Sequence, residues 1–129
     1  MKLDPIIAVS DVPETSKWYQ AVFDCCSIHG GDEFDVLVDS DNEILICLHK
    51  WEAHGHPTMQ NKDLTPGNGL ILYFRTEKMD HIRKNVRDLG YSVEKEIQMN
   101  PNSGQREFSV IDPNGYYLTI SEYHSYGPL

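Results

Sequence analysis

Histidine residues are concentrated in one stretch of this sequence. His54 and His56 form a His-x-His pair, and His49 and Glu52 lie just before it. Imidazole nitrogens and carboxylates can bind divalent zinc, nickel, manganese or iron, so the cluster could hold a transition metal. The alternative is that these histidines are structural or face solvent, since such spacing is common in loops. We favour this second interpretation, and we expect no bound cofactor.

A second candidate for chemistry is the pair Arg106-Glu107. If its side chain faces a cavity, Glu107 could bind a cationic ligand or act as a base. The alternative is an ion pair at the end of a strand, which would contribute only about 0–1 kcal/mol when exposed. The sequence contains no nucleophile elbow, phosphate-binding loop or dinucleotide-binding fingerprint. Glu107 is therefore the one candidate catalytic residue.

The three cysteines predict free thiols. Their number is odd, and Cys25 and Cys26 are adjacent, which fits neither a disulfide framework nor a metal site. Free thiols are typical of a reducing compartment. The sequence also has no apolar signal region at its start and no run near the roughly 20 apolar residues that a membrane span needs. We therefore expect a cytoplasmic protein that does not bind membranes.

The charge of the chain is strongly negative. Twenty acidic residues against 11 lysines and arginines give a formal net charge of −9 over 129 residues. Nucleic-acid binding requires a basic surface, so we expect no nucleic-acid partner. Simple solubility is one explanation of the acidity. The other is long-range attraction of cationic ligands.

The elements that position these residues follow one order twice. Hydrophobic periodicity and turn residues predict the following series: a strand at 6–9, a helix at 13–24, strands at 26–30, 34–38 and 43–49, an aperiodic loop at 51–68, a strand at 69–75, a helix at 79–89, and strands at 91–97, 106–111 and 116–123. No linker of distinct composition separates the halves. We therefore predict one α+β domain over residues 1–129, with a first module at about 1–60 and a second at about 66–129.

Two segments of the chain resemble a known superfamily. The first runs from Pro5 through Asp11 to Tyr19, and the second is the stretch Arg106-Glu107-Phe108 followed by Asp112-Pro-Asn-Gly. Together they resemble the vicinal oxygen chelate (glyoxalase/bleomycin-resistance/dioxygenase) superfamily, and the second segment is similar to its bleomycin-resistance-like branch. The resemblance implies two βαβββ modules in a cupped, partly open eight-stranded sheet. It also implies a ligand cavity and a homodimer.

Metal-dependent members of this superfamily have one ligand on the first strand and one on the last strand of each module. The resemblance places these four positions at Asp4, Ile46, Ile71 and Thr119. Isoleucine has no donor atom, and threonine is a poor ligand. The resemblance therefore implies a site without metal, with His49, His54 and His56 as the alternative metal site.

Strand alternation predicts which residues line the cavity. Side chains two residues apart on a strand share a face, so residues two positions from Ile46, Ile71 and Thr119 are also predicted to face the cavity. Trp51 could cover the mouth of the cavity. The predicted ligand-binding residues are Ile46, Leu48, Trp51, Ile71, Tyr73, Arg75, Glu107, Tyr117, Thr119 and Ser121. The opposite face, which includes Cys47 and Leu118, is expected to pack under the helices.

The sequence thus favours a small-molecule-binding protein of this superfamily. The resemblance implies that it holds an organic ligand, with cations as one class, in the cavity of a homodimer without metal. Apolar and aromatic side chains with a few polar groups are typical of such sites. The alternative is an enzyme, either a glyoxalase-like lyase or isomerase or a dioxygenase-like protein, with a non-standard or absent metal site.

Overall fold

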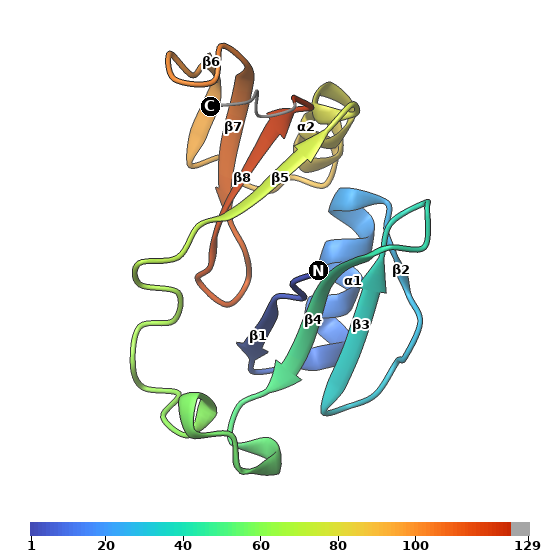
Figure 1. The fold of residues 1–129 in the computed structure, drawn as a ribbon, viewed down its shortest axis with the longest axis vertical. Coiled ribbons are helices and arrows are strands. Elements are labelled where there is room, and N and C mark those ends of the chain that lie inside the picture. Colours follow the sequence, from blue (N-terminus) through green and yellow to red (C-terminus); the bar gives the residue numbers. More distant parts are fainter. Residues whose placement is uncertain (125–129) are drawn as a thin grey trace. The chain divides into compact units, whose positions relative to one another are not determined.

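The computed structural model describes residues 1–124. The chain forms two compact units, Met1–Pro66 and Gly67–Leu129, and the order of strands and helices is the same in both (Figure 1). Neither helix of the described chain is both long enough and apolar enough to cross a membrane.

The first unit is a four-stranded sheet with one helix against it. Its elements are β1 (Ile6–Val9), α1 (Val12–Phe23), β2 (Cys26–Ser27), β3 (Phe34–Val38) and β4 (Ile44–Lys50), with the strand order β1-β4-β3-β2. Strands β1 and β4 are parallel, and the other pairs are antiparallel. Two short 3-10 helices, Ala53–Gly55 and Pro57–Met59, follow β4.

Helix α1 begins and ends at recognisable capping residues. The side chain of Asp11 accepts a hydrogen bond from the Glu14 N–H at 3.0 Å, and Pro13 occupies the first turn. Asp24 ends the helix in a left-handed conformation with φ 55°. Between these ends, Tyr19 and Val22 are fully buried and pack the helix onto the sheet.

The second unit repeats this arrangement. Its elements are β5 (Leu72–Thr76), α2 (Met79–Asp88), β6 (Lys95–Met99), β7 (Arg106–Ile111) and β8 (Tyr117–Glu122), with the strand order β5-β8-β7-β6. Helix α2 buries Met79, Ile82 and Val86, three positions at helical spacing. The predicted α+β fold of two βαβββ modules is confirmed. Backbone pairing forms two four-stranded sheets, and their closure into one eight-stranded cup stays a prediction.

Three predicted strands differ from the observed ones by at least three residues. The strand predicted at 69–75 begins only at Leu72, after a turn in which the Leu70 N–H donates to the Gly67 carbonyl. The strand predicted at 91–97 begins only at Lys95, because the Tyr91 N–H donates to the Val86 carbonyl and keeps the chain attached to the end of α2. The strand predicted at 26–30 stops at Ser27, since the following residues form a loop anchored by side-chain hydrogen bonds. Local turn chemistry overrides the apolar pattern at all three places.

Equivalent turns connect the last two strands of each unit. The Asp112 N–H donates to the Tyr116 carbonyl, and the Asp112 carboxylate accepts the Asn114 and Tyr116 N–H groups. Asp39 makes the matching bonds before β4, accepting the N–H groups of Asp41 and Glu43. The tight turn predicted at Asp112-Pro-Asn-Gly is confirmed.

The two units differ by one inserted residue. In the second unit, Val110 and Ile111 pair with Leu118 and Tyr117, which are adjacent. In the first, Leu37 and Val38 pair with Ile46 and Ile44, so Leu45 is an extra residue in β4. Such a β-bulge reverses the faces of all later side chains relative to the earlier ones. The faces of β4 therefore cannot be obtained by simple alternation along the strand.

A buried carboxylate joins three elements of the first unit. Asp35, which is 2% exposed, accepts hydrogen bonds from the hydroxyl groups of Ser16 on α1 and Ser27 on β2, both at 2.7 Å. It also accepts the N–H groups of Gly30 at 2.7 Å and Val36 at 2.8 Å. Burial alone would raise the pKa of Asp35, but these four donors outweigh it and hold the pKa below its ordinary value.

We predict that Asp35→Asn destabilises the protein by about 3 kcal/mol at pH 7, because hydrogen bonds to a charged acceptor are lost. Urea unfolding followed by circular dichroism measures the change. Since the folded-state pKa is lowered, the contribution is present above the ordinary aspartate pKa and is lost as the pH falls through the folded value. The difference in free energy of unfolding between the variant and the unmodified protein should therefore be smaller at pH 3 than at pH 7. Asp41→Asn, at an exposed turn residue, is the control and should change stability little.

Candidate ligand-binding site

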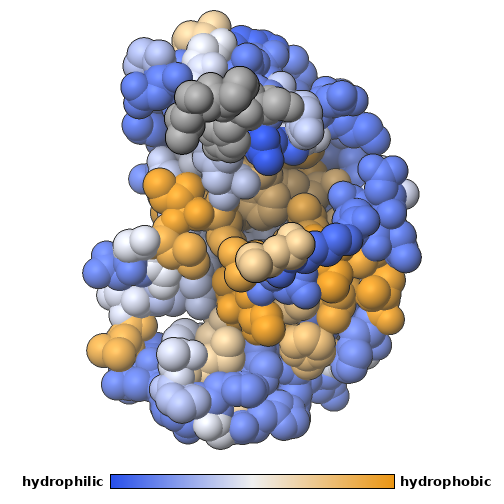
Figure 2. All heavy atoms as spheres, in the orientation of Figure 1, coloured by the Kyte–Doolittle hydropathy of each residue, from blue (hydrophilic) through white to orange (hydrophobic). Residues whose placement is uncertain are grey.

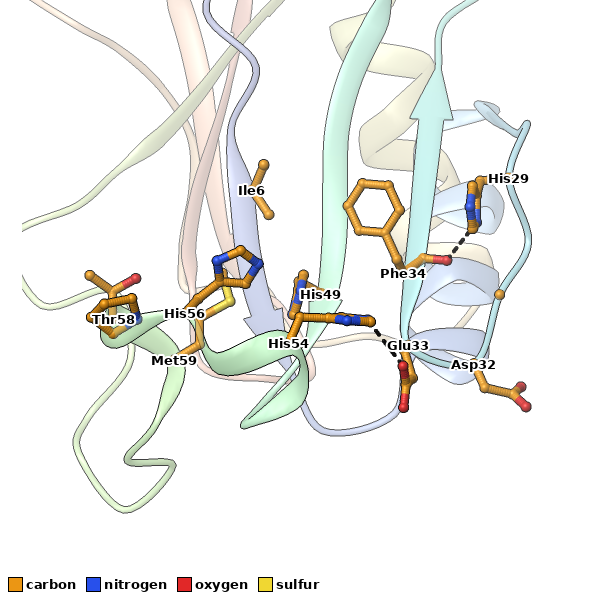
Figure 3. Close-up of a pocket in the computed structure, with 12 residues that line it drawn as sticks. Ile6, His29, Asp32, Glu33, Phe34, His49, His54, His56, Thr58 and Met59 are labelled. Atoms are coloured by element: carbon orange, nitrogen blue, oxygen red, sulfur yellow. Dashed lines mark hydrogen bonds and ion pairs between the residues drawn. The ribbon is translucent and has the colours of Figure 1, made fainter.

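A pocket of about 870 Å³ lies in the first unit, on the sheet face opposite α1 (Figure 3). Apolar side chains form much of its wall, together with four imidazoles, two carboxylates, Gly31 and Thr58. The apolar residues are Ile6, Phe34, Pro57 and Met59, the imidazoles belong to His29, His49, His54 and His56, and the carboxylates are those of Asp32 and Glu33.

Strand register explains how three of these residues come together. Phe34 on β3 pairs with His49 on β4, and His49 pairs with Ala8 on β1, two residues after Ile6. Because side chains alternate along a strand, Ile6, Phe34 and His49 share the face away from α1. The remaining walls come from the loop before β3 and from the two 3-10 helices after β4.

The three histidines predicted as an alternative metal site lie close together. The ring centroids of His49 and His56 are 4.8 Å apart and those of His49 and His54 are 5.4 Å apart, with the rings nearly perpendicular. His49 places Nδ1 at 2.8 Å from the Lys50 carbonyl, and His54 places Nε2 at 3.1 Å from Glu33. The imidazoles are thus held mainly by ring packing, one backbone contact and one exposed contact with the Glu33 carboxylate.

This arrangement does not fit a metal centre. Within residues 1–124, no three His, Cys, Asp or Glu side chains converge in a way that could hold an ion. The superfamily positions fit no better. Ile71 has no donor atom, and the bulge at Leu45 makes Cys47, rather than Ile46, the counterpart of Thr119. Cys47 is a buried thiol whose pKa is raised by burial. The donor set of the described chain therefore supports no step that runs through a metal.

The segment over the pocket has an unusual backbone. Glu52 and His54 adopt left-handed φ values of 68° and 59°, which cost non-glycine residues free energy on the order of 1–2 kcal/mol each. The Glu52 N–H donates to the Met59 carbonyl at 2.6 Å, closing the segment on itself. His54 and Met59 thereby reach the pocket from a compact turn rather than from an open loop.

A second, smaller pocket of about 230 Å³ lies in the second unit. Five predicted ligand-binding residues line it together: Ile71, Tyr73, Glu107, Tyr117 and Thr119. Tyr73 pairs with Thr119 across β5 and β8, and Thr119 pairs with Ser109 across β8 and β7. The register thus places their side chains on the face away from α2.

Arg106 and Glu107 point to opposite faces and do not pair with each other. Arg106 binds Asp80 on α2 at 2.8 Å and Glu122 at 3.3 Å, whereas Glu107 accepts a hydrogen bond from the Asn100 amide at 2.6 Å. The interactions with Asp80 and Glu122 raise the pKa of Arg106. Of the two interpretations of this pair, the structure therefore supports the one in which Glu107 faces a pocket.

The predicted roles of Ile46 and Leu48 are wrong. Both side chains are fully buried, and Leu48 pairs with Asp35, whose carboxylate binds Ser16 on α1. They therefore lie under the helix. The bulge at Leu45 accounts for the error, because it brings His49 rather than Leu48 to the pocket face.

Three other predicted residues lie outside both pockets. Trp51 is half-buried, and its backbone N–H donates to the Val9 carbonyl at 3.1 Å. Arg75 stacks over the Tyr123 ring at 5.6 Å, and the fully buried Ser121 donates to the Glu122 carbonyl. The strand register places Arg75 and Ser121 on the predicted face of the sheet, but neither residue lines the pocket.

Several pocket residues were missed by the sequence analysis. Ile6 and Phe34 appeared there only as strand residues, and His29 and Met59 were assigned no role. Phe34 carried one usable signal, since it is the sole aromatic residue of its strand and follows the polar segment Gly31-Asp32-Glu33. Convergence of these side chains depends on tertiary structure, which periodicity does not reveal.

The thiols are poorly suited to nucleophilic chemistry. Burial raises the pKa of Cys25 to about 12 and also raises the pKa of Cys47, so both are protonated at neutral pH. Cys26 is exposed but lines neither pocket. The site therefore offers hydrogen bonding, ring stacking and charge, and no activated thiol.

The fold is shared with several solved structures. An integron cassette protein from the mobile metagenome of V. cholerae matches with a TM-score of 0.72 at 23% identity, over 96% of both chains. A glyoxalase/bleomycin resistance protein/dioxygenase family enzyme from Burkholderia phytofirmans matches with a TM-score of 0.73 at 20% identity, over 92% of this chain and 95% of that one. A lactoylglutathione lyase from Agrobacterium tumefaciens matches with a TM-score of 0.71 at 14% identity, over 95% and 92%.

These likenesses show the fold of the glyoxalase/bleomycin resistance/dioxygenase group. No protein-family model matches the sequence, and no curated protein is significantly similar to it. The superfamily resemblance is therefore confirmed at the level of fold, and the bleomycin-resistance-like branch stays a prediction.

We predict that one cysteine per chain reacts rapidly with iodoacetamide in the folded protein at pH 8. Cys26 is the exposed thiol, whereas burial raises the pKa of Cys25 and Cys47 and restricts access to them. Peptide mass spectrometry after a short reaction identifies the modified residue. Full reaction of all three in urea is the control, and equal labelling of Cys25 and Cys26 without urea would contradict the described packing.

Proposed function

We propose that this protein binds a small organic molecule non-covalently in the pocket of the first unit. The ligand has an aromatic body and, in the preferred form, a positive charge. The observation that carries the proposal is the wall of this pocket, where Ile6, Phe34 and Met59 are joined by four imidazoles. Apolar surface with a few polar groups is the usual composition of a site for organic ligands.

The aromatic preference follows from the rings in the pocket. The Phe34 ring lies edge-on to His29 at 5.2 Å and to His49 at 6.1 Å. Because such rings interact favourably in offset or edge-to-face arrangements, an inserted aromatic group gains contact with several of them. The volume of about 870 Å³ lies in the range typical of sites for drug-sized molecules.

The preference for a cation follows from charge. Asp32 and Glu33 are exposed lining residues, and the whole chain carries a formal net charge of −9. The overall field raises the local concentration of cations, and the two carboxylates can pair with one at the pocket. Since both carboxylates are exposed, we expect them to contribute mainly to ligand selectivity and to the rate of association, and little to the binding free energy.

The proposal includes a homodimer in the cytoplasm, without a metal ion. Figure 2 shows hydrophobic residues on a mostly hydrophilic surface, and Ile6, Ile71 and Leu64 are at least half exposed. Such side chains favour a dimer because association would bury them. The free cysteines support a reducing compartment.

An enzyme is the second candidate. The adjacency of His49, His54 and His56 is the observation that favours it, and a lactoylglutathione lyase has the same fold. A glyoxalase-like or dioxygenase-like activity would need these imidazoles to rearrange around an ion, or Glu107 to act as a base without one. The binding proposal needs no such rearrangement.

We predict saturable binding of the cationic dye ethidium in the micromolar range, a typical order of magnitude for a partly open aromatic pocket. Fluorescence titration measures it. Phe34→Ala should weaken binding about tenfold, because the central ring contact is lost. Glu33→Gln should weaken it about twofold, while neutral phenanthridine should bind both forms equally.

Phe23→Ala is the matched control for Phe34→Ala. It removes a half-buried ring of the same unit that does not line the pocket, so ethidium affinity should be unchanged while the protein remains folded by circular dichroism. Equal affinity of the Phe34→Ala variant and the unmodified protein would refute the assignment of this pocket. Absence of saturable binding across bleomycin and a panel of cationic aromatic compounds would refute the binding function.

We predict well below one bound ion per chain after dialysis against zinc, nickel, manganese and iron(II) in turn. The reason is the missing convergence of ligands within residues 1–124. Plasma mass spectrometry gives the count, with the variant His54→Ala/His56→Ala as a comparison. One ion per chain that disappears in this variant would favour the enzyme.

A further inference from the structure

The smaller pocket contains a carboxylate oxygen that lacks a partner. Glu107 Oε1 accepts a hydrogen bond from the Asn100 amide at 2.6 Å. Glu107 Oε2 is buried, and within residues 1–124 it has no hydrogen-bond partner. A buried carboxylate oxygen without a donor is unfavourable, and such groups are rare in folded proteins. Glu107 Oε2 therefore calls for a donor that residues 1–124 do not supply.

The surroundings fix the position of this oxygen. Asn100 holds one side of the carboxylate, and Glu107 lies on the central strand β7, between β6 and β8. Beside it, the hydroxyl groups of Ser109 and Thr119 bond to each other at 2.9 Å, which uses one of their two O–H donors. The carboxylate of Glu107 is a stronger acceptor than either hydroxyl.

The rest of the lining defines what kind of donor fits. Ile71, Tyr73, Phe108 and Tyr117 provide apolar and aromatic surface in a volume of about 230 Å³. Aromatic faces attract organic cations, and a carboxylate binds a positively charged N–H donor more strongly than a neutral one. Lys95 also lines the pocket, but it forms no ion pair with Glu107. A small molecule with an ammonium group on an apolar body would satisfy both kinds of surface.

We propose that the second unit contains a separate site for a small organic ammonium compound, whose ammonium group donates to Glu107 Oε2. The site rests on residues of the second unit only. It is independent of the pocket proposed for the larger aromatic ligand, which is lined by the first unit only.

Benzylammonium and benzyl alcohol form a probe pair that tests the site, since they have similar shape and differ in charge. Titration followed by ¹⁵N–¹H correlation NMR gives both affinity and location. We expect benzylammonium to bind about tenfold or more tightly than benzyl alcohol, because only it offers a charged donor. The amide signals of Ser109 and Thr119 should shift, and those of Phe34 and His49 should mark any binding in the first unit.

Glu107→Gln is the decisive variant. It keeps the shape of the side chain and an oxygen for Asn100, but it replaces the open acceptor by a donor, so the preference for benzylammonium should disappear. Glu77→Gln removes one exposed negative charge of the same unit outside the pocket and should leave the preference intact. Because no native partner of Oε2 is lost, Glu107→Gln should melt at or above the temperature of the unmodified protein.

A second variant keeps the proposal testable if Glu107→Gln does not fold. Ile71→Trp changes a residue that is 58% exposed, retains Glu107 and fills part of the pocket, so it should weaken both probes. Shifts confined to Phe34 and His49, or an unchanged preference in Glu107→Gln, would overturn this site without affecting the ethidium result. Loss of ethidium binding alone would overturn the first-unit pocket and leave this site standing.

Discussion

The buried carboxylate of Asp35 holds the first unit together where three elements meet. It faces α1, while its neighbour Phe34 faces the pocket, so one strand connects the interior hydrogen bonds to the pocket wall. The bond from Gly30 fixes the loop that carries His29 and Glu33. The pocket wall therefore depends on a group that does not itself line the pocket, and we expect the wall to keep its geometry only while Asp35 is negatively charged.

The two units use the same framework for two different surfaces. Strand order and hairpin turns are equivalent in the two units. The extra residue Leu45 places His49 on the pocket face of the first unit, at the position that Ser121 occupies in the second. The first unit consequently presents imidazoles and the second presents hydroxyl groups and a carboxylate. A repeated fold thus supports a larger pocket lined by imidazoles and a smaller one lined by tyrosines and a carboxylate, without any change in topology.

The sequence predicted the parts of the structure that depend on local pattern. The βαβββ order, both helices and the turn at Asp112 follow from periodicity and turn chemistry, and in β5 and β8 unbroken alternation placed Tyr73 and Thr119 on the pocket face. The faces of Ile46 and Leu48 were wrong because a bulge has no clear sequence signature. The role of Asp35 was missed since its donors come from three separate elements.

The parallel pairing of β1 with β4 also sets the order in which the chain can fold during synthesis. Ile6 finds its partner Cys47 only after the helix and two intervening strands have been made. At roughly 5–20 residues per second, the first strand waits on the order of seconds with its backbone groups unpaired. β5 must wait in the same way for β8, so each half of the nascent chain closes with its oldest strand added last.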